Sequence, residues 1–198
     1  MPVSQACSIF TADLTARHLS NTDHEFYLNK GKNLIETFLH SVEFDNNQVV
    51  EQKITVKLED MTLTGNLDLL QIDKKAKTIT VFDYKTGAPF DKFDSGTKFK
   101  THGYKQQLMF YKLLLDNTPE YTGYKIEQGI IHFVEPIDGS IKTICLHYSE
   151  SDIEEFTNLI KIIWKHIQNL NFPDVSKYEK NLRGSMQFEK DLISEVIL

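Results

Sequence analysis

Apolar and polar residues alternate along three neighbouring stretches of the chain. The stretches are 49–58, 62–72 and 78–85. In the first of them Ile54 and Val56 fall on one face of an extended chain, while Thr55 and Lys57 fall on the other. Such alternation is typical of half-buried strands, and only short turns separate the three stretches. The pattern therefore predicts an antiparallel meander.

Helical periodicity appears on both sides of this meander. Apolar residues recur at near-helical spacing over 25–42 and again over 100–116, which predicts one or two helices before the meander and one after it. Two further strands are predicted at 126–135 and 139–147, joined by the turn PIDGS. Residues 86–98 are rich in Gly, Pro and Asp, so we expect a loop between the meander and the helix that follows it.

The clearest helical pattern covers residues 152–170. Six apolar residues at helical spacing form its predicted buried stripe: Ile153, Phe156, Ile160, Ile163, Ile167 and Leu170. Ser151 and Glu154 have the spacing of an N-terminal capping box, and Pro173 is expected to end the helix. Trp164 is predicted to lie in the core. The order of the elements predicts an α/β fold in which helices flank a mixed sheet.

The length of 198 residues suits one domain. We expect an N-terminal helical segment (1–45), a core (46–170) and a C-terminal tail (171–198). The sequence leaves open whether the chain is a piece of a longer protein. The formal net charge of −6 argues against a protein held on nucleic acid by bulk charge alone. Cys7 and Cys145 give no disulfide framework and no metal-ligand spacing, which favours a reducing, cytoplasmic location. We find no run of membrane-span length and no secretion signal, so no membrane association is expected.

The stretch 78–85 carries charge where a strand should present its core face. Asp83 and Lys85 share a face with Val81. Asp68 stands in an apolar segment of the preceding strand and can approach Asp83 across the hairpin. Two neighbouring carboxylates repel unless a divalent cation neutralises them, and Mg²⁺ or Mn²⁺ suits carboxylate and carbonyl oxygens. With Lys85 to activate a water or to stabilise a phosphate, the residues fit metal-assisted hydrolysis of a phosphodiester.

The helix predicted at 100–116 supplies a second group of polar residues. Gln107 and Tyr111 are four residues apart and share one helical face, with Tyr104 near them. An amide beside an aromatic hydroxyl can grip a nucleic-acid backbone or brace the metal-site loop. Three lysines make this neighbourhood locally basic: Lys100, Lys105 and Lys112. Together with Tyr104 they are the candidates for DNA contacts.

Three short motifs follow one another in this region. They are GNLD (65–68), DYKTG (83–87) and QLMFY (107–111). In this order they resemble the motifs G-x-x-D, D-x-K-T-G and Q-x-x-x-Y of RecB-type domains of the PD-(D/E)xK nuclease superfamily, a resemblance that covers about 50–135. It implies a restriction-endonuclease-like core and an Mg²⁺- or Mn²⁺-dependent DNA nuclease, an exonuclease of DNA repair or recombination. It also implies a helicase domain or subunit as a partner.

The resemblance further implies roles for single residues. Asp68 and Asp83 would bind the metal with the backbone carbonyl of Tyr84, and Lys85 would be catalytic. Gln107 and Tyr111 would complete the catalytic site. Many relatives carry a metal-site histidine on a helix before the meander, and the candidates here are His18, His24 and, best placed, His40. Other relatives hold an iron–sulfur cluster through four cysteines, which a chain with two cysteines cannot do.

Two classes of function remain open from the sequence. The first is an active DNA nuclease, and the second is a degenerate nuclease fold that serves as a DNA-binding or protein-docking module. The presence of Asp68, Asp83 and Lys85 together favours the first. The sequence does not distinguish exonuclease from endonuclease, the polarity of cleavage, or a preference for single or double strands. Glu51, on the polar face of its strand, is interpreted as solvated.

Overall fold

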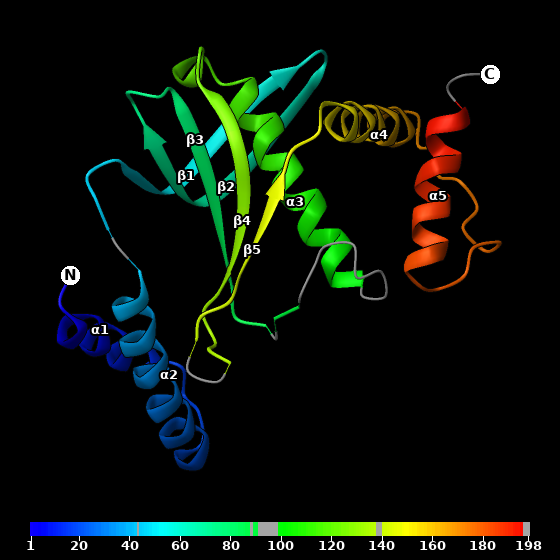
Figure 1. Cartoon of the computed structure of the whole chain (residues 1–198). Helices are drawn as coiled ribbons and strands as arrows, with labels where there is room; N and C mark the ends of the chain where they lie inside the picture. Colours follow the sequence, from blue (N-terminus) through cyan, green and yellow to red (C-terminus); the bar gives the residue numbers. More distant parts are fainter. Residues whose placement is uncertain (43, 88, 91–98, 138–139, 196–198) are drawn as a thin grey trace. The chain divides into compact units, whose positions relative to one another are not determined.

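The computed structural model describes residues 1–42, 44–87, 89–90, 99–137 and 140–195 (Figure 1). Its helices are α1 (Val3–Thr15), α2 (Asn21–Ser41), α3 (Phe99–Asp116), α4 (Glu150–Gln168) and α5 (Leu182–Glu195), with a 3₁₀ turn at Pro119–Tyr121. Its strands are β1 (Gln48–Leu58), β2 (Met61–Asp73), β3 (Thr78–Lys85), β4 (Lys125–Phe133) and β5 (Thr143–His147). No helix within the described ranges has the length and apolar composition needed to cross a membrane.

The five strands form one sheet in the order β1-β2-β3-β4-β5. β1 pairs with β2 and β2 with β3 in antiparallel register, which confirms the predicted meander. The N–H of Lys125 donates to the carbonyl of Lys77, and the N–H of Val134 donates to that of Lys85. Because both partners advance in the same direction, β4 runs parallel to β3, and α3 forms the crossover that a parallel pair requires. The sheet is therefore mixed, as predicted.

The described residues form two compact units. The first consists of Met1–Asn46, Tyr84–Pro89 and His132–Thr143, and the second of Asn47–Asp83, Phe90–Ile131 and the part of Ile144–Leu198 that is described. The predicted loop at 86–98 falls mostly on positions 88 and 91–98, which lie outside the described residues, as does position 139, the predicted first residue of the last strand. β5 begins at Thr143.

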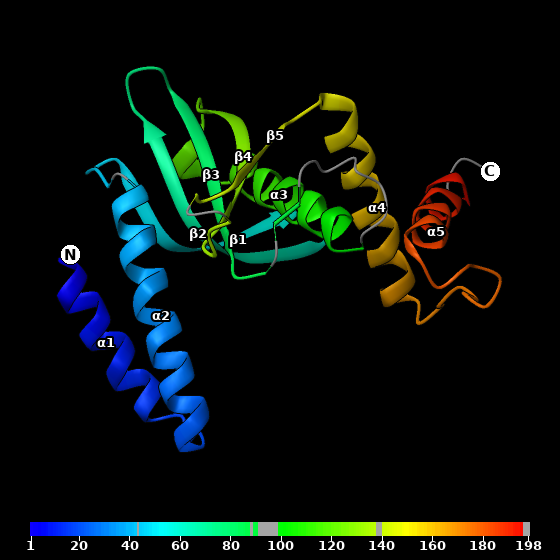
Figure 2. The same ribbon diagram turned by 60° about the horizontal axis from the view of Figure 1, so that its bottom comes forward.

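The first unit is built around the helix pair α1–α2. The two helices lie side by side (Figures 1 and 2), and the ring of Phe10 rests against Gly31, where any Cβ would overlap it. Phe38 of α2 makes edge-to-face contacts with Tyr84 and His132, each at 5.3 Å between ring centroids. α1 was not predicted from the sequence. It begins after Pro2 with no side-chain cap, and none of its residues is buried, so neither a capping motif nor a strong apolar stripe marks it.

The second unit holds most of the sheet, with α3 packed on β1 and β2. Gly65 of the GNLD motif allows this close packing, because a Cβ there would lie 2.7 Å from Cδ1 of Leu114 in α3. Leu114 itself is fully buried. The glycine therefore lets α3 approach the sheet closely enough for its side chains to reach residues of β3.

Helix α4 differs from its prediction at its start and in its buried face. The N-cap is Ser149, whose Oγ accepts from the N–H of Asp152 at 3.1 Å, so the capping box predicted at Ser151 is wrong. The predicted stripe is also wrong in part. Ile163 and Ile167 are 41% and 46% exposed, whereas Leu159 and Ile162, outside that stripe, are buried.

The remainder of the second unit explains which face of α4 is buried. Leu192 of α5 packs against Leu159 and Ile162, with Phe188 and Ile193 beside them. Trp164, predicted to lie in the core, is only half-buried, and its indole N–H donates to Asp60 in the β1–β2 turn at 3.1 Å. Part of the C-terminal tail is thus a helix, α5, and its contacts select the face that α4 buries.

Candidate active site

Two aspartates meet across the neighbouring strands β2 and β3. Leu69 pairs with Phe82, so the same register carried one residue further sets Asp68 opposite Asp83. Side chains directly opposite each other in an antiparallel pair have Cβ atoms about 4.5–5.5 Å apart. Asp83 follows Val81 on the buried face and is itself only 1% exposed, while Asp68 is half-buried. A buried and a half-buried carboxylate therefore stand on the same face of the sheet, as predicted from the alternation.

A chain of hydrogen bonds from α3 holds the Asp83 carboxylate. The hydroxyl of Tyr111 donates to Oδ1 of Asp83 at 3.2 Å, and Nε2 of Gln107 donates to the Tyr111 hydroxyl at 2.7 Å. The two donors come from one face of α3 because they are four residues apart. Tyr111 is 5% exposed, so the contact to Asp83 lies in the protein interior. These two hydrogen bonds fix the orientation of the Asp83 carboxylate.

Burial and the negative charges of Asp83 and Asp68 all raise the pKa of the Tyr111 hydroxyl. Burial raises this pKa above its ordinary value, and the negative charge of Asp83 raises it further. The hydrogen bond from Gln107 acts in the opposite direction, and the charge of Asp68 again raises the pKa. The hydroxyl consequently remains protonated at neutral pH and stays a donor to Asp83. Gln107, Tyr111, Asp68 and Asp83 are thus brought together as the sequence predicted.

Replacing Tyr111 by phenylalanine should destabilise the fold, because a buried carboxylate loses a donor while the ring stays in place. We expect a loss of about 1–3 kcal/mol in the free energy of unfolding, measured by urea denaturation. Tyr27→Phe is a matched control on α2, at a ring that is 48% exposed, and should change stability by less than about 0.5 kcal/mol. Equal urea midpoints for Tyr111→Phe and wild type would show that this hydrogen bond contributes nothing.

Lys85 is the last residue of β3, two positions beyond Asp83. Its carbonyl accepts from the N–H of Val134 at 3.0 Å, so the strand is still paired where the lysine stands. Alternate residues of a strand point to the same side. The catalytic role of Lys85 stays a prediction. Between Asp83 and Lys85, the ring of Tyr84 contacts His132 at 5.6 Å between centroids. The metal-ligand role of the Tyr84 carbonyl stays a prediction.

The three histidines proposed as metal ligands all belong to the first unit. His40 is exposed near the end of α2, two residues from Phe38 and hence on another side of that helix. Nε2 of His24 lies 3.3 Å from Oγ1 of Thr15, and His18 is exposed between α1 and α2. The role of His40 as a ligand stays a prediction.

The donors in the described structure fit a hard divalent cation. Across the described residues, no group of three or more His, Cys, Asp or Glu side chains is arranged to hold a metal ion. A cation would therefore rely on the paired carboxylates of Asp68 and Asp83, with a backbone oxygen and water as further ligands. Mg²⁺ is bound in this way, through one or two carboxylates and several retained waters. Close carboxylates also gain most from a cation, since it removes their mutual repulsion.

The lysines proposed to contact DNA lie on different faces of α3. Lys100 is exposed and lies on the face of Gln107, seven residues away, with Tyr104 between them. Lys105 and Lys112 are displaced from Gln107 by two and five residues, which places them on the far side of the helix.

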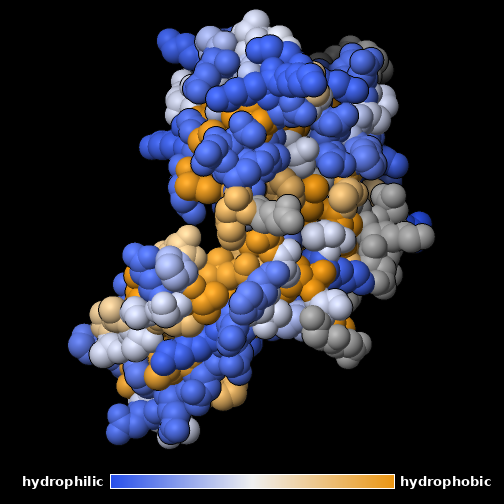
Figure 3. Space-filling model, turned by 60° about the vertical axis from the view of Figure 1, so that its left-hand side comes forward, coloured by the Kyte–Doolittle hydropathy of each residue, from blue (hydrophilic) through white to orange (hydrophobic). Residues whose placement is uncertain are grey.

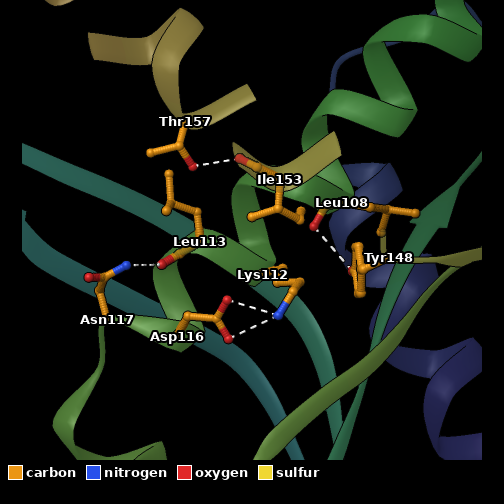
Figure 4. A network of polar contacts seen from close by, with 8 residues as sticks. All are labelled: Leu108, Lys112, Leu113, Asp116, Asn117, Tyr148, Ile153 and Thr157. Carbon is orange, nitrogen blue, oxygen red and sulfur yellow. Dashed lines mark hydrogen bonds and ion pairs between the residues drawn. The ribbon is translucent and has the colours of Figure 1, made fainter. Parts of the chain in front are cut away.

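Both far-side lysines are also paired with carboxylates. Nζ of Lys105 lies 3.2 Å from Asp152. Nζ of Lys112 lies 2.8 Å from Asp116 and stands over the ring of Tyr148. Figure 4 draws the ion pair between Lys112 and Asp116. Within α3, all of whose residues are described, the basic patch expected around the Gln107–Tyr111 face therefore retains only Lys100.

Two features of the site were not found from the sequence. Phe90 stacks on Tyr104 with ring centroids 6.0 Å apart and is 8% exposed. An aromatic residue inside a loop rich in Gly and Asp was the only available signal. Glu189 of α5 bonds to His102 and Gln106 on another side of α3, and nothing in the local sequence pattern indicates these contacts.

Comparison with known proteins adds a family. The family model described as the PD-(D/E)XK nuclease superfamily matches residues 5–181. A comparison with curated proteins gives no match. Among solved structures, a protein from Eubacterium rectale described as a candidate exonuclease is 12% identical, with a TM-score of 0.47, over 87% of this chain and 70% of its own. The protein SSO0001 is 15% identical, with a TM-score of 0.36, over 82% of this chain and 87% of its own.

Proposed function

The chain belongs to the PD-(D/E)XK nuclease superfamily, and from this premise we propose that it is a DNA nuclease that depends on Mg²⁺ or Mn²⁺ and hydrolyses phosphodiester bonds. The observation that carries the proposal is the Asp83 carboxylate, buried opposite Asp68 and held by the Gln107–Tyr111 hydrogen-bond chain. Burying a charged carboxylate beside a second one costs free energy that structural stability alone does not explain. The pair is well suited to binding a catalytic cation.

Each residue of the site has a distinct task in this proposal. Asp68 and Asp83 would hold the cation, which when bound supplies charge stabilisation to the phosphate oxygens. Tyr111 and Gln107 keep the carboxylate of Asp83 in one orientation through bonds of 3.2 and 2.7 Å. Lys85, at the end of the same strand, would orient the attacking water or stabilise negative charge on the phosphate. None of these tasks needs a side chain outside the predicted set.

The wider role of the nuclease rests on the resemblance to RecB-type domains. That resemblance supports exonuclease action, a place in DNA repair or recombination, and a helicase domain or subunit as a partner. The motif order GNLD, DYKTG and QLMFY, now attached to β2, β3 and α3, is the feature that carries it.

Cleavage assays on defined DNA test both the activity and its mode. We expect end-labelled linear DNA to be shortened in Mg²⁺ or Mn²⁺, to stay intact in EDTA, and closed circular DNA to persist, as an exonuclease requires. Nicking of the circle would assign an endonuclease instead. Binding of DNA or of a protein without any cleavage under these conditions would support a degenerate nuclease fold that acts as a docking module.

DNA binding should depend on the cation and on Lys100. Because the net charge is −6, affinity without divalent ion should be weak and should rise when Ca²⁺ screens the aspartates without supporting turnover. The salt dependence should be shallow, on the order of two to four phosphates in the log–log slope. Fluorescence anisotropy with several DNA sequences at several salt concentrations measures both quantities.

A pair of charge reversals on the same helix locates the contact. Lys100→Glu should weaken binding to all sequences alike, since backbone contacts carry no base information. Lys112→Glu, on the far side of α3, should leave affinity near that of wild type. Equal losses in the two variants, or equal affinity with and without Ca²⁺, would contradict a contact at the Gln107–Tyr111 face.

A further inference from the structure

Glu189 of α5 makes three polar contacts with α3. Its carboxylate oxygens lie 2.9 and 3.1 Å from Nε2 of His102, and Nε2 of Gln106 donates to Oε1 at 3.0 Å. The side chains of His102 and Glu189 are 19% and 24% exposed, so water competes only partly for these bonds. One carboxylate thus binds two side chains that α3 presents one turn apart.

These contacts act on the same helix as the candidate active site. Gln106 directly precedes Gln107, and residues that follow each other in a helix point about 100° apart. Any roll of α3 about its axis that moves Gln106 therefore moves Gln107 and Tyr111 by the same angle. Tyr111 reaches Asp83 at 3.2 Å, a distance that a small roll would lengthen beyond a hydrogen bond. The rotational setting of α3 decides whether the donor chain to Asp83 is intact.

Side chains do not fill all of the space beside α3 on the side of α5. A cavity of about 360 Å³ lies where α3, α4 and α5 meet, lined by residues that include Met109, Phe156 and Met186. α5 is itself anchored on α4, because Leu192 packs against Leu159 and Ile162. The contacts of Glu189 therefore connect α5, which is anchored on α4, to α3 beside this cavity. In Figure 2 the helices α3, α4 and α5 can be followed one after another. α5 begins at Leu182, directly after residue 181, where the family match ends.

We propose that Glu189 is a positioning residue that sets the rotation of α3 and thereby holds Tyr111 against Asp83. The proposal rests on the proposed nuclease function for its kinetic consequence, but not for its structural one. In this proposal α5 holds α3 in position, although α5 contains none of the three sequence motifs.

Steady-state kinetics of DNA cleavage separate positioning from plain stabilisation. In Glu189→Ala, assayed well below its melting temperature, we expect kcat to fall on the order of tenfold or more while KM changes little, since the reacting groups and not the DNA contacts are displaced. Glu189→Gln keeps an amide oxygen that accepts one of the bonds and should recover most of the loss. The double variant His102→Ala/Gln106→Ala removes the same contacts from α3 and should reproduce the fall.

The matched control is Asp191→Ala on the same helix. Asp191 accepts from Tyr178 and Gln187, each at 2.7 Å. Within the described residues it forms no hydrogen bond or ion pair with α3. The Asp191→Ala variant should have a lower melting temperature than wild type but a kcat close to that of wild type. An unchanged kcat in folded Glu189→Ala, or equal falls in the Glu189 and Asp191 variants, overturns the proposal.

A measurement without DNA keeps the proposal testable if the chain does not cleave. The tyrosines are labelled with fluorotyrosine, and the Tyr111 signal in the ¹⁹F NMR spectrum is assigned by its loss in Tyr111→Phe. We expect this signal to shift in Glu189→Ala and to stay in place in Asp191→Ala. An unmoved Tyr111 signal in Glu189→Ala refutes the positioning role, whereas absent cleavage by the wild type refutes only the nuclease proposal.

Discussion

Replacing Asp83 by alanine is expected to abolish both metal binding and DNA cleavage. Asp83 is the buried member of the carboxylate pair, and without it Asp68 would be the one carboxylate of the pair left to bind the proposed cation. A cation at such a site contributes several kcal/mol of charge stabilisation, so its loss should cost roughly a thousandfold or more in rate. Isothermal titration with Mn²⁺ measures the binding, and the cleavage assay measures the rate.

Two further variants keep this result interpretable. Asp83→Asn preserves the shape of the side chain and an acceptor for Tyr111, so the fold should survive while the metal is still lost. Asp73→Ala is the matched control at the far end of the same hairpin, where the carboxylate caps the N–H groups of Lys75 and Ala76. Wild-type cleavage by Asp83→Asn would exclude a metal role for this residue.

Replacing Lys85 by alanine is expected to abolish cleavage while metal binding remains. The lysine stands at the end of β3, beyond the aspartate pair, and in the proposal it acts on the water or the phosphate and not on the cation. Loss of a positioned acid–base or charge-stabilising group typically costs about 10²–10⁴-fold in rate. The same titration with Mn²⁺ should give an affinity close to that of wild type.

The contrast between the two substitutions is the informative result. If Lys85→Ala lost the metal as Asp83→Ala does, its role would be to maintain the site and not to assist the chemistry. Lys53→Ala, an exposed lysine on β1, controls for the loss of a positive charge near the sheet and should cleave normally. A Lys85→Ala variant that cuts DNA at the wild-type rate would refute the catalytic assignment.

Much of the sheet and of the candidate site was predictable because both depend on local spacing. The third strand was predicted with the bounds that the structure shows, 78–85, since its alternation is regular and short turns flank it. The register that sets Asp68 opposite Asp83 follows from the length of the hairpin turn. Gln107 and Tyr111 meet because four residues make about one helical turn.

The errors arose where the sequence allows more than one face. Helix α4 carries apolar residues over a broad arc, so Leu159 and Ile162 compete with Ile163 and Ile167 for burial. The contact with Leu192 decides this competition, and the sequence of α4 does not contain it. α1 escaped prediction because a helix without buried residues or a cap leaves little periodic signal.

The sequence by itself determined the identity, order and spacing of the polar groups in β2, β3 and α3. It did so because the periods of strand and helix decide which side chains share a face, whatever the rest of the chain does. Only the tertiary structure decided which side chains of other elements contact α3. It pairs Lys105 of α3 with Asp152 at the start of α4. It also brings Glu189, more than eighty residues later, onto His102 and Gln106, a contact between distant segments that no local period records.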